Sequence, residues 1–439
     1  YGTYFYIKEG KNGQPPTNWR SYFGGSVWEK VPGYENKFYL HSFAKEQPDL
    51  NWENEVVREK IYEMICWWMD QGLAGFRIDA IMNIKKDLTW SDLEPDGPDG
   101  LADVYKVTGK VKGIGDFLLE MKHRCFEPYD ALTVGEAMFV KEEILPQFIG
   151  DQGYFSTIFA FEPCHAYRKG KNYMDYDWPQ PFDDWKKETF HNQKIIEKAG
   201  FEANIIENHD QPRSVSRFGN DSDEYREISA KMLATCIHMM QGTPYVYQGE
   251  ELGMTNCPFN TLDNFRDLES INAFHELTEQ GKMTEEDMMA AIGYKGRDNA
   301  RTPMQWDDSA YAGFSTANPW IMVNPNYTKI NAKDQVNRED SVFKYYQKLI
   351  KLRHESELIV YGTYDLILDD DKDIYAYIRT LGDKKLIVYC NFSENTREVE
   401  LPEEFTNGKV LISNYIDAKV NHKICLLYTS PSPRDRQKS

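Results

Sequence analysis

The sequence predicts an α/β fold that contains part of a (β/α) barrel, followed by a small antiparallel β domain. Three short apolar runs, at residues 75–79, 131–136 and 203–210, each end in an acidic residue. Helical patterns separate these runs, and such alternation is typical of parallel strands joined by crossover helices. Beyond residue 358 the pattern changes to short β runs separated by turns. This change of period predicts a second, antiparallel domain.

The N-terminal part begins with irregular sequence and then becomes regular. Residues 1–53 are rich in Gly, Pro, Asn and aromatic side chains and predict a long, loop-rich excursion. Residues 54–71 predict a helix that stops at Gly72. The expected apolar stripe of this helix comprises Val57, Ile61, Met64 or Ile65, and Trp68. Strand 75–79 follows, and the acidic, Gly-rich residues 87–109 predict a loop.

The alternation of helix and strand then continues to about residue 357. Helical patterns occupy residues 113–125, 141–148, 182–199, 223–240 and 341–354, and strand patterns occupy residues 131–136, 155–161, 203–208 and 243–248. The later β runs lie at residues 374–378, 386–391, 397–401 and 409–412, with turns at 382–383 and 407–408. These later runs predict the small antiparallel domain.

The C-terminal residues 425–439 differ from everything before them. They are polar and basic and show no period. A flexible tail and translated vector sequence are both compatible with this composition. We interpret the segment as a non-native tail and exclude it from the fold.

Charge and hydropathy exclude several classes of partner. The net charge is −19, from 51 Lys and Arg against 70 Asp and Glu. A field of that sign repels phosphate backbones, so we expect no nucleic-acid partner. No apolar run approaches the roughly 18 residues that a membrane span needs, so we expect no membrane partner. We also expect a monomer.

The cysteines indicate neither a disulfide framework nor a zinc site. The seven Cys residues are scattered singly, without a Cys-x-x-Cys pair. Cys66 and Cys236 lie inside helical patterns and are expected to be small core residues. A reducing cytoplasm fits this usage best. A missing signal peptide is uninformative, because the chain has no initiator Met.

The ends of the three apolar runs carry the candidate chemistry. Arg77 and Asp79 are two apart on a strand, so both side chains leave the same face, and the arginine keeps the carboxylate ionised. Glu136 ends another strand after an apolar approach, where partial burial raises a carboxyl pKa as a general acid requires. Asp210 ends the third run beside His209.

Any one of these carboxylates is explained equally well by a buried ion pair or a helix N-cap. Their recurrence at successive strand ends is different, because barrel enzymes hold their active sites there. Three carboxylates with an arginine and a histidine indicate a site for glycosidic-bond chemistry.

With these motifs the chain resembles the alpha-amylase superfamily, glycoside hydrolase family 13, in its oligo-1,6-glucosidase/α-glucosidase branch. The resemblance covers residues 1 to about 415. The matching segments are Gly-Phe-Arg-Ile-Asp at 75–79, Val-Gly-Glu at 134–136, Asn-His-Asp at 208–210, Gln-Pro-Asp-Leu-Asn at 47–51, Tyr-Gln-Gly-Glu-Glu at 247–251, and Arg-Asp-Asn-Ala-Arg-Thr-Pro-Met-Gln-Trp at 297–306.

The resemblance implies a partial (β/α)8 TIM barrel with strands 4–8 present. Residues 1–53 would be the excursion (B) domain between barrel strand 3 and helix 3, residues 54–357 the catalytic barrel, and residues 358–424 the C-terminal antiparallel β domain. The family's Asp-x-x-x-Asn-His segment and its metal loop have no counterpart here. We therefore expect an N-terminally truncated, inactive fragment. No cofactor is expected, and a structural Ca²⁺ or Mg²⁺ ion would belong to the missing N-terminal part.

The resemblance also assigns roles to individual residues. It implies a retaining double displacement with Asp79 as nucleophile, Glu136 as acid/base and Asp210 as transition-state stabiliser. Arg77, His209 and Arg297 would bind the terminal glucose, with Arg301 as a further candidate. No metal ligand is expected. Asp49 and Asn51 are candidates for either structural or substrate-binding roles.

Substrate choice stays open at this point. The residue after the nucleophile influences linkage preference in this branch, with Val typical of α-1,6-specific enzymes, and here it is Ala80. We expect an exo-acting α-glucosidase that removes terminal α-1,6-linked glucose from isomaltose-type oligosaccharides, with α-1,4 linkages as an open alternative.

Other members of the family share most of these motifs. Trehalose-6-phosphate hydrolase and an α-glucosyl isomerase or transferase are the alternatives, although the Arg-Leu-Asp-Arg-Asp loop of sucrose isomerases is absent. The alternative of another class is a non-catalytic relative, such as an amino-acid-transporter heavy chain. Such relatives carry a membrane span and lack the full acid set.

Overall fold

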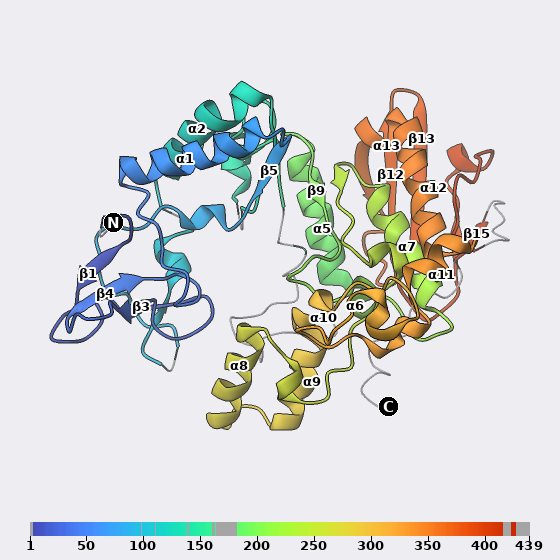
Figure 1. Ribbon diagram of the computed structural model, residues 1–439. Coiled ribbons are helices and arrows are strands. Elements are labelled where there is room, and N and C mark those ends of the chain that lie inside the picture. The colour runs from blue at the N-terminus through green and yellow to red at the C-terminus, as the bar shows by residue number, and fades with distance from the viewer. Residues whose placement is uncertain are drawn as a thin grey trace. The chain divides into compact units, whose positions relative to one another are not determined.

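A computed structural model of the chain describes residues 3–97, 99–109, 111–137, 140–159, 163, 182–415 and 423–426. The chain divides into two compact units, Tyr1–Ala160 and Phe161–Ser439, which are described separately (Figure 1). In the part of the chain that the structure describes, no helix is both long and apolar enough to cross a membrane.

The first unit opens with short strands where the sequence predicted only loops. Strands β1 (Ile7–Glu9), β4 (Lys37–Leu40) and β3 (Trp28–Lys30) form an antiparallel sheet in the order β1-β4-β3. Strand β2 (Trp19–Arg20) pairs in parallel with β6 (Ala102–Asp103), inside the stretch predicted as the 87–109 loop. Large aromatic side chains explain both corrections, since Trp19, Trp28 and Phe38 form a buried core with Tyr6 and Leu40.

A parallel sheet follows and places the first two predicted acids. Strands β5 (Gly75–Ile78), β7 (Leu132–Gly135) and β8 (Thr157–Ile158) pair in parallel in that order. Gly75 is required, because a Cβ atom there would lie 1.7 Å from the carbonyl oxygen of Leu132. A strand was predicted over residues 155–161, and of its described residues, 155–159, only Thr157 and Ile158 form a strand, β8.

Helices of the first unit precede each of these strands. Helix α1 (Glu55–Asp70) starts where predicted, because the Asn54 side chain accepts the amide hydrogen of Val56. Its buried stripe is Val57, Tyr62, Ile65 and Met69, so the predicted stripe was right at two positions and displaced by one residue elsewhere. The other helices are α2 (Ile114–Met121) and α3 (Leu145–Phe148).

The second unit contains one short parallel pair and several helices. Strands β9 (Ala203–Asn204) and β10 (Thr243–Pro244) pair in parallel and are much shorter than predicted. Helices α5 (Phe182–Ile196), α7 (Arg226–His238) and α12 (Val342–Glu355) confirm three predicted helices to within a few residues. The smaller helices are α6 (Ser214–Phe218), α11 (Ala332–Asn337) and α13 (Glu357–Tyr361).

Helices α8, α9 and α10, like α11, lie in a stretch to which the sequence analysis assigned no element. Helices α8 (Leu268–Glu279) and α9 (Glu285–Lys295) form a hairpin around a small apolar core that includes Phe265 and Met288. The short helix α10 (Asp298–Arg301) follows directly. This long excursion from β10 to α12 brings the 297–306 motif into the fold.

The C-terminal part is antiparallel, as predicted. Strands β11 (Thr363–Ile367), β12 (Ile374–Leu381) and β13 (Lys384–Asn391) form one sheet. Strand β14 (Arg397–Glu400) pairs with β15 (Lys423–Leu426), which includes the first two residues of the expected tail. Residues 409–412, expected to form a strand, have none, and β15 provides the partner of β14. Residues 427–439 lie outside the described residues.

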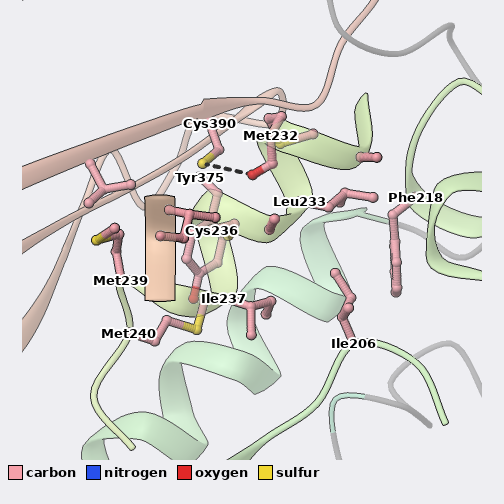
Figure 2. Packing of buried hydrophobic residues seen from close by; sticks show 14 of the residues in the cluster. Ile206, Phe218, Met232, Leu233, Cys236, Ile237, Met239, Met240, Tyr375 and Cys390 are labelled. Carbon is pink, nitrogen blue, oxygen red and sulfur yellow. Dashed lines mark hydrogen bonds between the residues drawn. The ribbon is translucent and has the colours of Figure 1, made fainter. Parts of the chain in front are cut away.

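The main core of the second unit joins this sheet to the helices. Figure 2 shows Met232, Cys236 and Met240 of α7 and its C-terminal end packed with Tyr375 and Cys390 of the sheet. The Cys390 thiol lies 3.9 Å from the carbonyl oxygen of Met232. Cys236 is fully buried as predicted, whereas Cys66 in α1 is half-buried.

A buried arginine joins the C-terminal sheet to two helix ends. Arg379 of β12 is fully buried and donates hydrogen bonds to four carbonyl oxygens. Met239, at the end of α7, accepts at 2.6 Å, and Ile359 and Gly362, around the end of α13, accept at 2.8 and 2.6 Å. Helix C-termini leave carbonyls without intrahelical partners and favour cations.

We expect Arg379→Lys to destabilise the protein by about 3–5 kcal/mol, because one ammonium group cannot reach all four carbonyls and leaves buried acceptors unpaired. Urea unfolding followed by circular dichroism measures this loss. Arg124→Lys, at an exposed ion pair with Glu59, is the control and should cost less than about 1 kcal/mol. Equal losses in both variants would contradict the structural role of Arg379.

Candidate active site

The first unit brings together three predicted site residues, Arg77, Asp79 and Glu136. Arg77 lies on β5, and its guanidinium pairs with both carboxylates, reaching Glu136 at 2.6 Å through Nη2 and Asp79 through Nη1. Arg77 is paired with Val134 in the parallel register of β5 and β7. Asp79 comes two residues after Arg77 and Glu136 two residues after Val134, so both carboxylates lie at the same end of the strands. Asp79 is largely exposed, whereas Glu136 is almost fully buried.

The two carboxylates of this group differ in environment, and that difference sets their acidity. Burial, and after it the neighbouring Asp79 carboxyl group, raise the pKa of Glu136 to about 7 against the opposing effect of Arg77. The backbone N–H of Ala80 also donates to Glu136 at 3.1 Å. Glu136 is therefore a carboxyl group that holds a proton near neutral pH, as the sequence predicted for the general acid.

Ala80, the predicted specificity residue, has an uncommon backbone conformation. Its φ of 42° and ψ of 36° lie in the left-handed region, which disfavours residues with a Cβ atom. The turn directs the Ala80 N–H to Glu136 and starts a 3-10 segment at Ile81. Local strain of this kind is concentrated at functional sites.

The 47–51 motif supports the segment that follows Asp79. Asp49 accepts hydrogen bonds from the backbone and hydroxyl groups of Ser42 and pairs with the buried Lys86 at 2.7 Å. The backbone N–H of Asn51 donates to Tyr4 at 2.8 Å. These contacts favour the structural interpretation of the motif. The sequence analysis did not single out Lys86, because a lysine in a mixed polar run gives no local signal.

The second unit brings together the other four predicted site residues. Arg297 and Arg301 both donate to Oδ1 of Asp210, at 3.2 and 2.7 Å. Arg301 also donates through Nε to the carbonyl oxygen of His209 at 2.9 Å. The His209 ring lies 3.4 Å from Oδ2 of Asp210. Helix α10 and its N-cap residue Arg297 thus place two cations on the carboxylate that follows β9.

Asp267 is a residue of this group that the sequence analysis missed. Its Oδ1 accepts from Arg297 at 3.0 Å from Nε and 2.5 Å from Nη2. Asp267 is the N-cap of α8, and an Asp followed by a helical pattern would have located the helix start. No sequence pattern identifies Arg297, thirty residues later, as its partner.

A buried ion pair lies behind the second group. Glu207 and Arg213 are both almost fully buried and pair at 3.0 Å. Arg213 also donates to the carbonyl oxygens of Gln248 at 2.7 Å and Ala300 at 3.4 Å. The hydroxyl of Tyr247 donates to Ala300 as well, at 3.0 Å. These bonds tie the 207–213 segment to the 247–251 and 297–306 motifs.

The seven predicted catalytic and binding residues therefore form two groups, one in each unit. Within the described residues, no group of three or more His, Cys, Asp or Glu side chains is arranged to hold a metal ion.

Comparison with known protein families matches residues 1–362 to the alpha amylase catalytic domain. The chain belongs to the alpha-amylase family. Residues 374–427 match the C-terminal domain of the alpha-amylase SusG. The fold is thus an alpha-amylase catalytic domain with a C-terminal antiparallel sheet domain, which confirms the family predicted from the motifs.

Individual members of the alpha-amylase family are similar over nearly the whole chain. The oligo-1,6-glucosidase of Parageobacillus thermoglucosidasius is 46% identical over 428 residues, covering 94% of this chain and 74% of the relative. The oligo-1,6-glucosidase of Bacillus cereus is 44% identical with the same coverage. The crystal structure of Bacillus licheniformis trehalose-6-phosphate hydrolase superposes with a TM-score of 0.86 at 41% identity, covering 98% of this chain and 77% of that one.

The raised pKa of Glu136 is measurable without any substrate. We expect its carboxyl carbon to titrate near pH 7 in ¹³C NMR spectra of protein labelled at the glutamate side chains. In Asp79→Asn the midpoint should fall, because the like charge that favours the proton is removed. Glu136→Gln assigns the signal. A midpoint below pH 5 in the unchanged protein would contradict the burial of Glu136.

Proposed function

We propose that the protein is a retaining, exo-acting α-glucosidase that removes terminal α-1,6-linked glucose from short oligosaccharides such as isomaltose. The observation that carries the proposal is the unequal carboxyl pair in the first unit, with Glu136 protonated near neutral pH and Asp79 paired with Arg77. The two oligo-1,6-glucosidase relatives support the linkage.

The proposed reaction has two steps. Asp79 attacks the anomeric carbon while Glu136 gives its proton to the departing glycosidic oxygen, which leaves a glucosyl ester on Asp79. Glu136, now ionised, takes a proton from water, and the water oxygen displaces Asp79 with a second inversion. The configuration is retained overall. Carboxylates, arginine and water suffice, so the proposal requires no cofactor.

The second group has a binding role in this proposal. Asp210, His209 and Arg297 bind the hydroxyl groups of the terminal glucose and favour the distorted ring of the transition state. Arg301, which bonds both Asp210 and the His209 carbonyl, is a further binding residue. Two arginines on one carboxylate oxygen keep Asp210 oriented before the sugar enters.

We also propose that β5, β7, β8, β9 and β10 are strands 4–8 of a (β/α)8 TIM barrel. In this interpretation residues 1–53 are the excursion domain, residues 54–357 belong to the barrel and residues 358–424 form the C-terminal β domain. The parallel pairing of β5 with β7, β7 with β8, and β9 with β10 supports the assignment.

Trehalose-6-phosphate hydrolysis is the second candidate function. The crystal structure of a trehalose-6-phosphate hydrolase covers 98% of this chain at 41% identity, close to the identity of the oligo-1,6-glucosidases. The two functions share the glucose-binding residues and differ in the group that leaves. Competition between isomaltose and trehalose 6-phosphate as substrates distinguishes them.

The proposed roles predict different responses to two leaving groups. Asp79→Asn should slow hydrolysis of both p-nitrophenyl α-glucoside and isomaltose by at least about 10³-fold, because the covalent route is lost. Glu136→Gln should slow isomaltose far more than the p-nitrophenyl substrate, since only the sugar leaving group needs a proton. The value of kcat/KM for isomaltose should fall as pH rises through about 7, where Glu136 loses its proton.

The purified protein is the material for these assays, with Asp371→Asn in the C-terminal sheet as a control for folding. Trehalose 6-phosphate hydrolysis without isomaltose hydrolysis would move the assignment to the second candidate. Loss of activity in Glu136→Gln that is equal for both leaving groups would argue against the acid role.

Linkage preference gives a separate prediction at Ala80. We expect Ala80→Val to raise the ratio of kcat/KM for isomaltose over maltose several-fold, because Val stands at this position in α-1,6-specific members of the branch. Ala80→Gly, which removes the Cβ atom from a left-handed residue, is the control and should leave the ratio unchanged. An unchanged ratio in Ala80→Val would remove Ala80 from the specificity residues.

A further inference from the structure

Arg297 is shared between two carboxylates in unlike surroundings. Towards the proposed glucose-binding group it donates one hydrogen bond, from Nη1 to Asp210 at 3.2 Å. On the other side it donates two hydrogen bonds, from Nε and Nη2, to Oδ1 of Asp267 at 3.0 and 2.5 Å. The Asp267 side chain is 1% exposed and that of Asp210 is 27% exposed. The tighter and more buried contacts of Arg297 are therefore those with Asp267.

Asp267 is itself held in place from several directions. Its Oδ2 accepts the backbone N–H of Ser270 at 3.2 Å and the Ser270 hydroxyl at 2.9 Å, as the N-cap of α8. The carboxylate of Asp298 accepts the backbone N–H groups of Arg266 and Asp267 at 2.6 and 3.0 Å. Asp298 follows Arg297 directly in the chain. Residues 266–267 and 297–298 are therefore joined by two kinds of contact. The Asp298 side chain binds the backbone of 266–267, and the Arg297 side chain binds the Asp267 side chain.

The charges agree with this geometry. Burial alone would raise the pKa of Asp267, but its hydrogen bonds with Arg297 and Ser270 hold that pKa below its usual value. Burial alone would lower the pKa of Arg297, but Asp267, with Glu269 and Asp210, raises it. Both groups are thus ionised, and a buried, fully hydrogen-bonded pair of this kind has one preferred geometry.

The arrangement has a consequence for Asp210. Oδ1 of Asp210 already accepts Arg301 at 2.7 Å. Arg297 donates to the same oxygen from the longer distance of 3.2 Å. Without the Asp267 anion, Asp210 would be the nearest carboxylate partner of Arg297, and this second bond would shorten. An Asp210 oxygen that is drawn into two strong ion pairs is less available for a sugar hydroxyl.

We propose that Asp267 is a positioning residue that holds Arg297 at a fixed distance from Asp210, so that both side chains are placed for the terminal glucose. Asp267 touches no reacting atom in this proposal, and its catalytic effect rests on the proposed α-glucosidase function. The effect is transmitted chiefly through the Arg297 guanidinium, because Nη1 of Arg301 lies farther from Oδ1 of Asp267, at 3.9 Å.

A substrate-free measurement tests the contact itself. In ¹⁵N-arginine-labelled protein, the Nε–H of Arg297 should give a signal protected from solvent exchange, which Arg297→Lys assigns by its loss. Asp267→Asn keeps the helix cap, since Asn caps as well as Asp, but removes the charge. We expect the protected signal to disappear in Asp267→Asn. A signal that persists unchanged overturns the proposal whatever the activity.

A kinetic double-mutant cycle tests the effect on catalysis. Asp267→Asn should lower kcat/KM for p-nitrophenyl α-glucoside by roughly 10–100-fold, as displaced binding groups do. In an Arg297→Lys background the same change should cost less than about 2-fold, because the group through which Asp267 acts is gone. Equal losses in both backgrounds would show a general structural effect and overturn the positioning role.

Asp371→Asn is the control, because Asp371, like Asp267, accepts backbone N–H donation, here from Asp373 and Ile374, and pairs with an arginine, Arg397, at 2.7 Å. It should change neither the Arg297 signal nor kcat/KM. If Asp267→Asn does not fold, Ser270→Ala removes one of the bonds that fix Oδ2 and should weaken the Arg297 signal and kcat/KM together. An unaltered signal in Ser270→Ala then overturns the proposal.

These measurements separate the two proposals. If the unchanged protein hydrolyses no α-glucoside, the proposed function is wrong, and the NMR comparison still decides whether Asp267 holds Arg297.

Discussion

The buried ion pair between Glu207 and Arg213 is the constraint on which the second unit depends. A buried charge is costly unless a partner and hydrogen bonds compensate it, and here two of the hydrogen bonds of Arg213 are supplied by segments distant in sequence. Arg213 reaches the carbonyls of Gln248 and Ala300 as well as Glu207. The pair therefore forms only when the strand-end segment, the loop after β10 and helix α10 have met. Because Arg213 binds the Ala300 carbonyl of α10, the same contact places α10 beside the segment that contains Asp210.

Both units use the same physical arrangement, an arginine between two carboxylates. In the first unit Arg77 joins Asp79 to Glu136, and in the second Arg297 joins Asp210 to Asp267. In each case one carboxylate is buried and the other is more exposed. A guanidinium remains charged under all ordinary conditions, so it orients both acids at every relevant pH. Burial raises the pKa of Glu136, whereas at Asp267 the hydrogen bonds with Arg297 and Ser270 outweigh burial and lower the pKa.

The sequence predicted what is local and missed what is long-range. Strand β5, the start of α1 at Asn54 and the antiparallel sheet after residue 358 follow from periodicity and capping, which act over a few residues. The stripe of α1 was displaced because periodicity alone does not choose between neighbouring stripes, and the buried residue is Tyr62 rather than Ile61. Asp267 was missed because its partner is thirty residues away and the contact depends on how the α8–α9 hairpin folds. The strand-end acids were found from the local pattern, whereas Arg297 and Arg301 were found only because a family resemblance carries such long-range information.

The buried Arg379 also orders events during synthesis of the chain. The carbonyl of Met239, at the end of α7, finds this donor 140 residues later. At the usual ribosomal rate of about 5–20 residues per second, roughly 7–28 s pass before the donor is made. Arg353, which bonds the carbonyls of His238 and Met240, arrives only slightly sooner. During that interval the carbonyl at the end of α7 is left to water or to chaperones, and it gains its arginine donor only when the sheet of β11, β12 and β13 emerges.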